Sequence, residues 1–284
     1  MDVALLPPSL ENLEIDMSPE LSAAWDLKLQ EHGQIIPLQP HPSLEELDIS
    51  NLTDKDQSRL LQLFPTITAL YIWQSPELTS LQLGYSKALR ELKIIDCGSL
   101  ASIEGFGSLT NLRSLAVSNS PGVPAFLELL SHQQLASAEI LSRLETLQVG
   151  DGSVLTVPLC RRLASLRRLS FWSWGSRRGE TMIDLTEEQE RALQLLASLH
   201  RLDFWHLPNL RSLPAGLRRL ASLEWLDVED CPGVARLPEM GLPPSLTRLH
   251  VRRCSEELSM QCKMAARENL DVHIDDLPVD YVII

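Results

Sequence analysis

A six-residue pattern recurs along this chain: an apolar residue, two variable residues, a leucine, one variable residue, and an aliphatic or aromatic residue. Successive segments start 34, 23, 22, 23, 32, 22, 33, 24 and 23 residues apart, so the basic unit has 22 to 24 residues. A fixed period of this length indicates a stack of similar supersecondary units. The ten segments are LENLEI from Leu10, LEELDI from Leu44, ITALYI from Ile67, LRELKI from Leu89, LRSLAV from Leu112, LETLQV from Leu144, LRRLSF from Leu166, LHRLDF from Leu199, LEWLDV from Leu223 and LTRLHV from Leu246.

This period is typical of leucine-rich repeats. The fourth and sixth residues of each segment point to one face of a short strand, and the third, fifth and seventh point to the other. Stacking joins the strands into a parallel sheet whose leucines form one continuous core. We therefore predict an α/β leucine-rich-repeat solenoid, with a curved parallel sheet on the concave face and helices and extended turns on the convex face.

The connections between strands carry helix signals. Thr186 to Gln189 form a capping box that leads into a helix of about three turns. A second helix is expected within residues 124–143, and a third from Asp54 to Leu63, closed off by Pro65. The short connections Pro208–Leu210 and Leu237–Glu239 should be extended or turn-like.

The repeats predict a single domain over residues 1–284, made of about ten irregular repeats. Ser255 is the expected N-cap of a capping helix region at 255–270, and residues 271–284 form a tail. The first strand segment starts nine residues after Met1, which leaves little chain for an N-terminal cap. We expect the apolar face of this repeat to be exposed, so that the chain is incomplete or docks to another protein.

Composition limits the class of protein. With 44% hydrophobic and 22% charged residues, the chain is expected to fold, and its uncharged runs are too polar for a membrane span. The acidic N-terminus is unlike a secretory signal, so we expect a cytoplasmic protein. The odd number of cysteines and the absence of a CxxC pair favour buried structural thiols over disulfides or zinc. The cysteines are Cys97, Cys160, Cys231, Cys254 and Cys262.

Motifs for catalysis and nucleic-acid binding are missing from the sequence. It contains no HExxH, GxSxG or GxxxxGK[ST] motif, and its seven histidines are scattered. We expect neither an enzyme nor a cofactor or metal site. The net charge of −13, with Asp203, Glu224 and Asp227 among the arginines, argues against nucleic acid as a partner.

Aromatic and basic residues at outward strand positions predict a protein-binding surface. Trp73, Trp172 and Trp205 all occupy the seventh position of their repeats. These rings either bind a foreign protein or are covered by another domain of a larger receptor. The full candidate set is Tyr71, Trp73, Arg90, Lys93, Arg113, Arg167, Arg168, Trp172, Arg201, Trp205, Trp225, Arg248 and Arg252.

The stretches LPNLRSLPAGLRRLASLEWLDVEDCPGVARLP and LPPSLTRLHVRRCSEELSMQCKMAA resemble plant disease-resistance proteins of the nucleotide-binding leucine-rich-repeat class. The resemblance implies the C-terminal repeat region of such a receptor, which holds the receptor inactive and senses ligands. The implied partner is a pathogen effector or a nucleotide-binding receptor domain, and the isolated chain should be a monomer.

Another role remains open from the sequence: a stand-alone substrate adaptor, for example for a ubiquitin ligase. The missing phosphate loop also leaves open whether the chain is a receptor fragment, a truncated product or a stand-alone protein.

Overall fold

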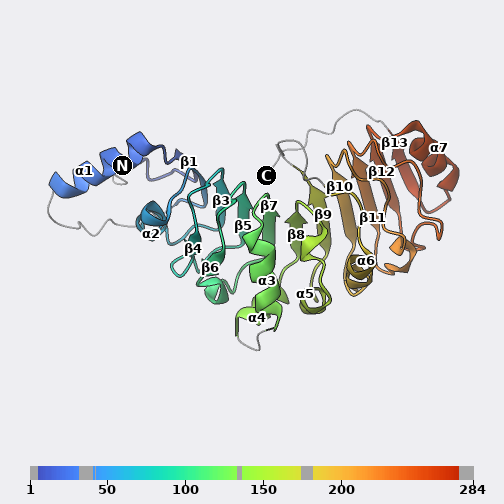
Figure 1. The fold of residues 1–284 in the computed structure, drawn as a ribbon, viewed down its shortest axis with the longest axis horizontal. Coiled ribbons are helices and arrows are strands. Elements are labelled where there is room, and N and C mark those ends of the chain that lie inside the picture. Colours follow the sequence, from blue (N-terminus) through green and yellow to red (C-terminus); the bar gives the residue numbers. More distant parts are fainter. Residues whose placement is uncertain (1–5, 32–40, 42, 133–135, 174–181, 275–284) are drawn as a thin grey trace. The chain divides into compact units, whose positions relative to one another are not determined.

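The computed structural model describes residues 6–31, 41, 43–132, 136–173 and 182–274, and its strands are drawn as arrows in Figure 1. The chain divides into two compact units, residues 1–146 and 147–284. Both are built from parallel strands alternating with helices and turns, which confirms the leucine-rich-repeat fold. The expectation of one domain over residues 1–284 stays a prediction.

The elements of the first unit are β1 (Asn12–Asp16), α1 (Pro19–Glu31), β2 (Glu46–Ser50), α2 (Asp54–Leu63), β3 (Ala69–Trp73), β4 (Ser80–Gln82), β5 (Glu91–Ile95), β6 (Ser102–Glu104), η2 (Phe106–Ser108), β7 (Ser114–Ser118), α3 (Gly122–His132) and α4 (Ala136–Leu141). The second unit begins within β8. Its elements are β8 (Thr146–Val149), η3 (Gly152–Val154), α5 (Val157–Arg162), β9 (Arg168–Trp172), α6 (Glu187–Leu193), β10 (Arg201–Trp205), η4 (Leu217–Arg219), β11 (Trp225–Glu229), β12 (Arg248–Arg252), α7 (Glu256–Ala265) and β13 (Asp271–Ile274).

Strands pair in the order β1-β2-β3-β5-β7 in the first unit and β8-β9-β10-β11-β12-β13 in the second. The register places equivalent repeat positions side by side, as in Leu202 beside Leu226 and Leu226 beside Leu249. From the second repeat onward, the first, fourth and sixth positions are buried in every repeat. In the first repeat only Ile15 is buried, whereas Leu10 and Leu13 are half-buried. Each repeat therefore depends on its neighbours for a closed core.

In most repeats, a residue with left-handed backbone geometry follows the strand at the eighth repeat position. Seven non-glycine residues have φ between 41° and 56° there. Asparagine and aspartate adopt this conformation at the lowest cost among residues with a side chain, and they fill four of the seven positions: Asn51, Asp96, Asn119 and Asp230. Their side chains link neighbouring repeats, since Asn119 Nδ2 donates to Asp96 Oδ1 at 2.7 Å.

In five repeats the ninth position carries a serine or cysteine: Ser75, Cys97, Ser120, Cys231 and Cys254. Ser75 Oγ accepts from the backbone N–H of Leu52 at 2.9 Å and donates to the Trp73 carbonyl at 2.8 Å. Cys231 Sγ lies 3.3 Å from the Glu229 carbonyl and 3.5 Å from the Phe204 carbonyl of the preceding repeat. These contacts give the ninth-position cysteines a structural role.

The four predicted helical regions contain helices, and one of these regions holds two. α2 has the predicted bounds, with Thr53 as its N-cap, and α3 and α4 cover most of residues 124–143. The capping box of α6 is present, and Ser255 caps α7. The turns at Pro208–Leu210 and Leu237–Glu239 contain no helix.

The predicted length of α6 was wrong, because this helix has seven residues rather than three turns. After Leu193, tighter bonds such as Leu196 N–H to the Leu193 carbonyl turn the chain so that Leu199 enters the core. α1 was not predicted at all. A signal was present, since Ser18 precedes Pro19 and its Oγ accepts from the Leu21 N–H at 3.3 Å.

The expected tail from residue 271 needs a correction. Residues Asp271–Ile274 form β13, which pairs in parallel with β12 and adds an eleventh strand of the repeat type. The strand forms because α7 returns the chain to the sheet, and Asp271 N–H bonds the Thr247 carbonyl. Residues 275–284 lie outside the described part of the chain, and the capping role of 255–270 stays a prediction.

The ninth-position contacts predict a large effect of Ser75→Ala. The substitution leaves the buried Leu52 N–H without its acceptor, which should lower the free energy of unfolding by about 1–3 kcal/mol. Ser75→Cys should lose less, because cysteine fills the equivalent position in later repeats. Urea denaturation of the three proteins measures this, and equal stability of wild type and Ser75→Ala would contradict the proposed role.

Candidate functional site

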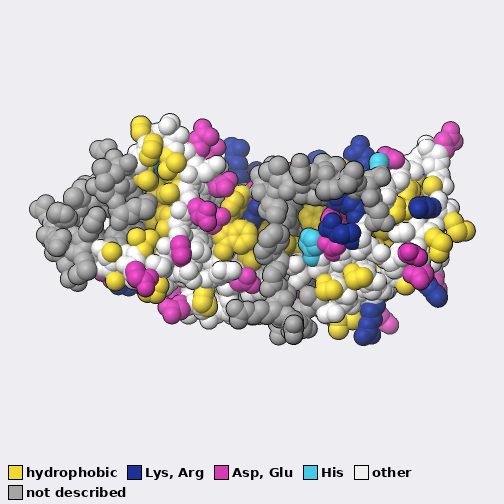
Figure 2. Space-filling view, turned by 90° about the horizontal axis from the view of Figure 1, so that it is seen from above, with side chains coloured by type: hydrophobic (Ala, Val, Ile, Leu, Met, Phe, Trp, Pro, Cys, Tyr) yellow, Lys and Arg dark blue, Asp and Glu magenta, His cyan; other side chains and the backbone are white. Residues whose placement is uncertain are grey.

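The candidate site lies on the face of each sheet that carries the third, fifth and seventh repeat positions, which we call the open face. On β9 to β12 these positions hold most of the predicted arginines and tryptophans. Figure 2 shows dark-blue basic side chains and cyan histidines together over the second unit. Five of these side chains form what we call the Arg–Trp cluster: Arg168, Arg201, Trp205, Trp225 and Arg248.

The Arg–Trp cluster is held together by stacking of guanidinium groups on indole rings. Arg201 Cζ lies 4.1 Å and Arg248 Cζ 4.9 Å from the centre of the Trp225 ring. Arg168 Cζ lies 5.0 Å from the centre of the Trp205 ring. These distances fall within the range of cation–π attraction. Strand register causes the stacking, because Arg201, Trp225 and Arg248 are direct neighbours on consecutive strands.

Two buried carboxylates at the fifth position form the floor beneath these arginines. Asp203 and Asp227 are both fully buried. Asp203 accepts from Arg168 Nε at 2.8 Å, Arg201 Nε at 2.7 Å and Ser170 Oγ at 2.7 Å. Arg201 Nη2 also reaches Asp227 at 3.4 Å. The carboxylates therefore orient the arginines from below, and the cations form the outer layer.

Burial of these carboxylates changes the pKa of Asp227. Burial, followed by repulsion from Asp203, raises the pKa of Asp227 to about 6, while Arg201 and Arg252 act in the opposite direction. Beside it, burial and the positive neighbours His273 and Arg252 lower the pKa of His250. His250 packs 5.2 Å from the Trp225 ring and 4.8 Å from the His273 ring, so the aromatic surface extends to β13.

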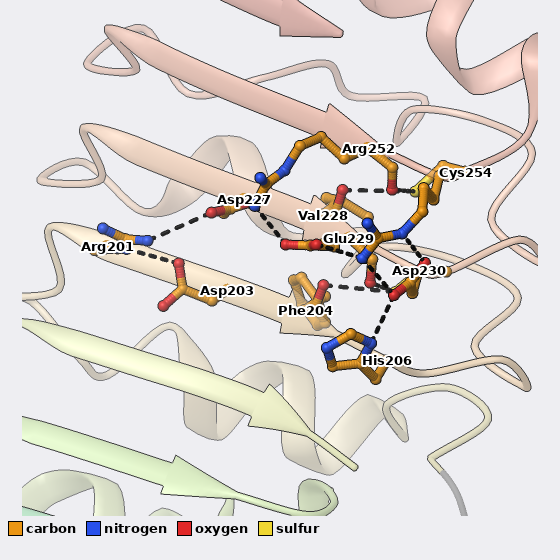
Figure 3. Close-up of polar contacts among 12 residues, drawn as sticks. Arg201, Asp203, Phe204, His206, Asp227, Val228, Glu229, Asp230, Arg252 and Cys254 are labelled. Carbon is orange, nitrogen blue, oxygen red and sulfur yellow. Dashed lines mark hydrogen bonds and ion pairs between the residues drawn. The ribbon is translucent and has the colours of Figure 1, made fainter. Parts of the chain in front are cut away.

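An ionic network runs along the carboxyl ends of β10, β11 and β12 (Figure 3). His206 Nδ1 lies 2.7 Å from Asp230 Oδ2, and Arg253 Nη2 donates to Asp230 at 2.7 Å and to Glu229 at 2.6 Å. Hydrogen bonding to Arg253 lowers the pKa of Asp230. Arg252 also bonds Glu229 and is itself buried. The predicted site residue Arg252 therefore packs into this network.

On the first unit the open face packs its predicted residues more tightly than expected. Tyr71 and Lys93 are only 5% and 6% exposed, and Lys93 Nζ lies 4.2 Å from the Tyr71 ring centre and 3.2 Å from Glu91 Oε1. Burial raises the pKa of Tyr71, and burial followed by repulsion from Glu14 raises the pKa of Asp48 to about 6. Trp73 stays half-buried beside this pair.

Three predicted arginines occupy the second repeat position and precede their strands. They come immediately before β5, β7 and β9 and are Arg90, Arg113 and Arg167. Arg113 Nη1 donates to the Thr110 and Leu112 carbonyls, which places it in the turn that enters the strand. These residues are therefore separate from the Arg–Trp cluster. Trp172 is closer to it, since its register partner is Trp205.

Sequence reasoning overlooked the fifth-position column of the second unit. Ser170, Asp203, Asp227, His250 and His273 stand side by side across five strands. Reading the repeats in register down this one position would have revealed a continuous polar column beneath the arginines. The sequence analysis treated these aspartates only as charges that dilute a basic surface.

Other candidate chemistries find little support in the described residues. No group of three or more His, Cys, Asp and Glu side chains among them could hold a metal ion. Burial raises the pKa of Cys97 to about 11 and of Cys160, Cys231 and Cys262 to about 12, so these thiols are poor nucleophiles. No described helix is both long and apolar enough to cross a bilayer.

Comparison with known proteins gives relatives for about two thirds of the chain. It is 30% identical over 200 residues, 68% of this chain, to the TMV resistance protein N of Nicotiana glutinosa, of which that stretch is 16%. It is 29% identical over 217 residues, 67% of this chain, to the disease resistance protein RPS4B of Arabidopsis thaliana, of which that stretch is 18%. The chain thus spans less than a fifth of the length of either relative. No family model matches.

Among solved structures, the leucine-rich-repeat domain of the type III effector XopL matches with a TM-score of 0.50. The match covers 89% of this chain and 81% of that chain at 18% identity, which supports the fold alone. Fold and repeat register together define a leucine-rich-repeat protein. Its repeats are those of the repeat region of plant disease-resistance proteins of the nucleotide-binding leucine-rich-repeat class.

The buried floor predicts a pH dependence of stability that Asp227 causes. Its folded pKa of about 6 exceeds the ordinary value of 3.8, so the folded state binds this proton more tightly than the unfolded chain. The resulting stabilisation is full below about pH 4 and is lost as pH rises through about 6. Over this range Asp227 should lower the free energy of unfolding by up to about 3 kcal/mol.

Denaturation of wild type and Asp227→Asn at a series of pH values isolates this effect, because all other groups titrate in both proteins. The difference between the two stability curves should change across this range, whereas Glu239→Gln, a substitution of an exposed carboxylate outside the floor, should leave the wild-type profile unchanged in shape. Parallel curves for wild type and Asp227→Asn would show that the buried carboxyl does not titrate as described.

Proposed function

We propose that this chain is the ligand-sensing and autoinhibitory repeat region of a plant intracellular immune receptor. The proposed partner is a pathogen effector or a nucleotide-binding receptor domain, and the chain itself acts by binding rather than by catalysis. The repeat type and its plant disease-resistance relatives support the class.

The observation that carries the proposal is the Arg–Trp cluster on β9 to β12. Its side chains occupy outward strand positions, whereas the leucine core is made by the first, fourth and sixth positions. The fold therefore does not need large aromatic residues there. Tryptophan and arginine are the residue types most enriched among the energetically dominant residues of protein interfaces. Binding of a protein explains why so many of them gather on this face.

A capture experiment tests the proposal. Full-length chain carrying Trp172→Ala, Trp205→Ala and Trp225→Ala should lose partners that wild type recovers from plant tissue. Each ring that acts as a hot spot should contribute about 2 kcal/mol to binding. Binding constants for recovered partners then follow from titration, and denaturation checks that the variant folds.

Tyr85→Ala serves as a matched control, because Tyr85 is 53% exposed and lies between β4 and β5, away from the open-face positions. Recovery of a nucleotide-binding receptor half or a pathogen protein by wild type supports the immune-receptor role. Recovery of ubiquitin-ligase subunits would instead favour the substrate adaptor. If the triple variant folds and still binds every partner, the Arg–Trp cluster is not the binding surface.

A further inference from the structure

Two arginines from the neighbouring strands lie over the Trp225 indole. Arg201 on β10 and Arg248 on β12 flank Trp225 on β11 at the same repeat position, with guanidinium carbons 4.1 Å and 4.9 Å from the ring centre. Stacking occupies the flat faces of guanidinium groups and leaves their N–H edges to form hydrogen bonds. The surface offered to a partner is therefore made of N–H donor edges as much as of aromatic rings.

The two arginines differ in what their edges bind. Arg201 donates to the buried carboxylates of Asp203 at 2.7 Å and Asp227 at 3.4 Å. Arg248 is exposed, and among the described residues it has no ion pair with a carboxylate. Its register neighbour Asp271 is bound instead by His273 Nε2 at 2.8 Å.

Charge is layered across this part of the open face. The carboxylates that balance the arginines, Asp203 and Asp227, are fully buried beneath them, so they are inaccessible to a partner. The guanidinium groups of Arg168 and Arg201 are 30% and 21% exposed, and Arg248 is exposed further along the same row. A partner thus meets a positive layer on a chain whose formal net charge is −13.

We infer that the row Arg201–Trp225–Arg248 binds an acidic segment of a partner protein, with a carboxylate of that segment seated on the N–H edge of Arg248. This inference rests on the proposed function and names the chemistry of its partner. Cation–π attraction to the Trp225 ring restricts the Arg248 guanidinium before a partner arrives, so less side-chain entropy is lost when it binds a carboxylate. A protein segment fits better than a nucleic acid, because it can present a single carboxylate to Arg248, whereas a continuous phosphate backbone would also pass the exposed carboxylates of Glu224 and Asp271.

Fluorescence anisotropy of the full chain with a labelled peptide of alternating glutamate and alanine tests this inference. The peptide should bind, binding should weaken as salt rises, and the matched peptide of glutamine and alanine should bind at least tenfold more weakly. Arg248→Gln should weaken binding of the glutamate peptide roughly tenfold, the loss expected for a hydrogen bond to a charged group. Arg248→Lys should recover part of it, since lysine keeps the charge but lacks the fork.

Arg191→Gln is the matched control, because Arg191 lies on α6 and its side chain is 72% exposed. This substitution should leave binding unchanged. Equal binding of the glutamate and glutamine peptides, or full binding by Arg248→Gln, would overturn the inference. Tighter binding of a single-stranded oligothymidylate than of the glutamate peptide would overturn it in favour of a phosphate ligand. If the peptide fails while the tryptophan variant still loses a captured partner, the proposed function stands and only this inference falls.

Discussion

The parallel pairing of equivalent repeat positions is the constraint on which the rest of the structure depends. Because Leu202, Leu226 and Leu249 stand side by side, each leucine covers its neighbours, and no repeat has a closed core alone. The same register also places equivalent side chains of the opposite face next to one another. Thus the Arg201–Trp225 contact at 4.1 Å and the buried Asp203–Asp227 pair both follow from the leucine pattern on the far side of the same strands.

Sequence alone predicted what the period controls. The buried leucines, the strands and the capped helices α2 and α6 follow from spacing and from local cap residues such as Thr53 and Thr186. The extra strand β13 did not, because Asp271–Ile274 lack the leading leucine of the pattern and form a strand only through pairing with β12. The protein-binding role of the predicted site residues stays a prediction.

The site itself was only partly predictable, because exposure depends on neighbours in other repeats. Alternation correctly assigns Lys93 and Arg252 to the outward side of their strands. It cannot tell that the Tyr71 ring covers Lys93, or that Glu229 binds Arg252, since these contacts join residues more than twenty positions apart. Outward direction and solvent exposure are separate properties on a face crowded with long side chains.

The buried aspartate floor has a consequence for how this surface changes over generations. Among the described residues, Arg248 makes no hydrogen bond or ion pair with a buried carboxylate, so single substitutions there alter the surface at little cost to folding. Replacing Arg201 removes a cation from two carboxylates that cannot reach water. Natural variants should therefore change Arg201 together with Asp203 or Asp227, so that diversification proceeds by correlated exchanges at one end of the row and by independent ones at the other.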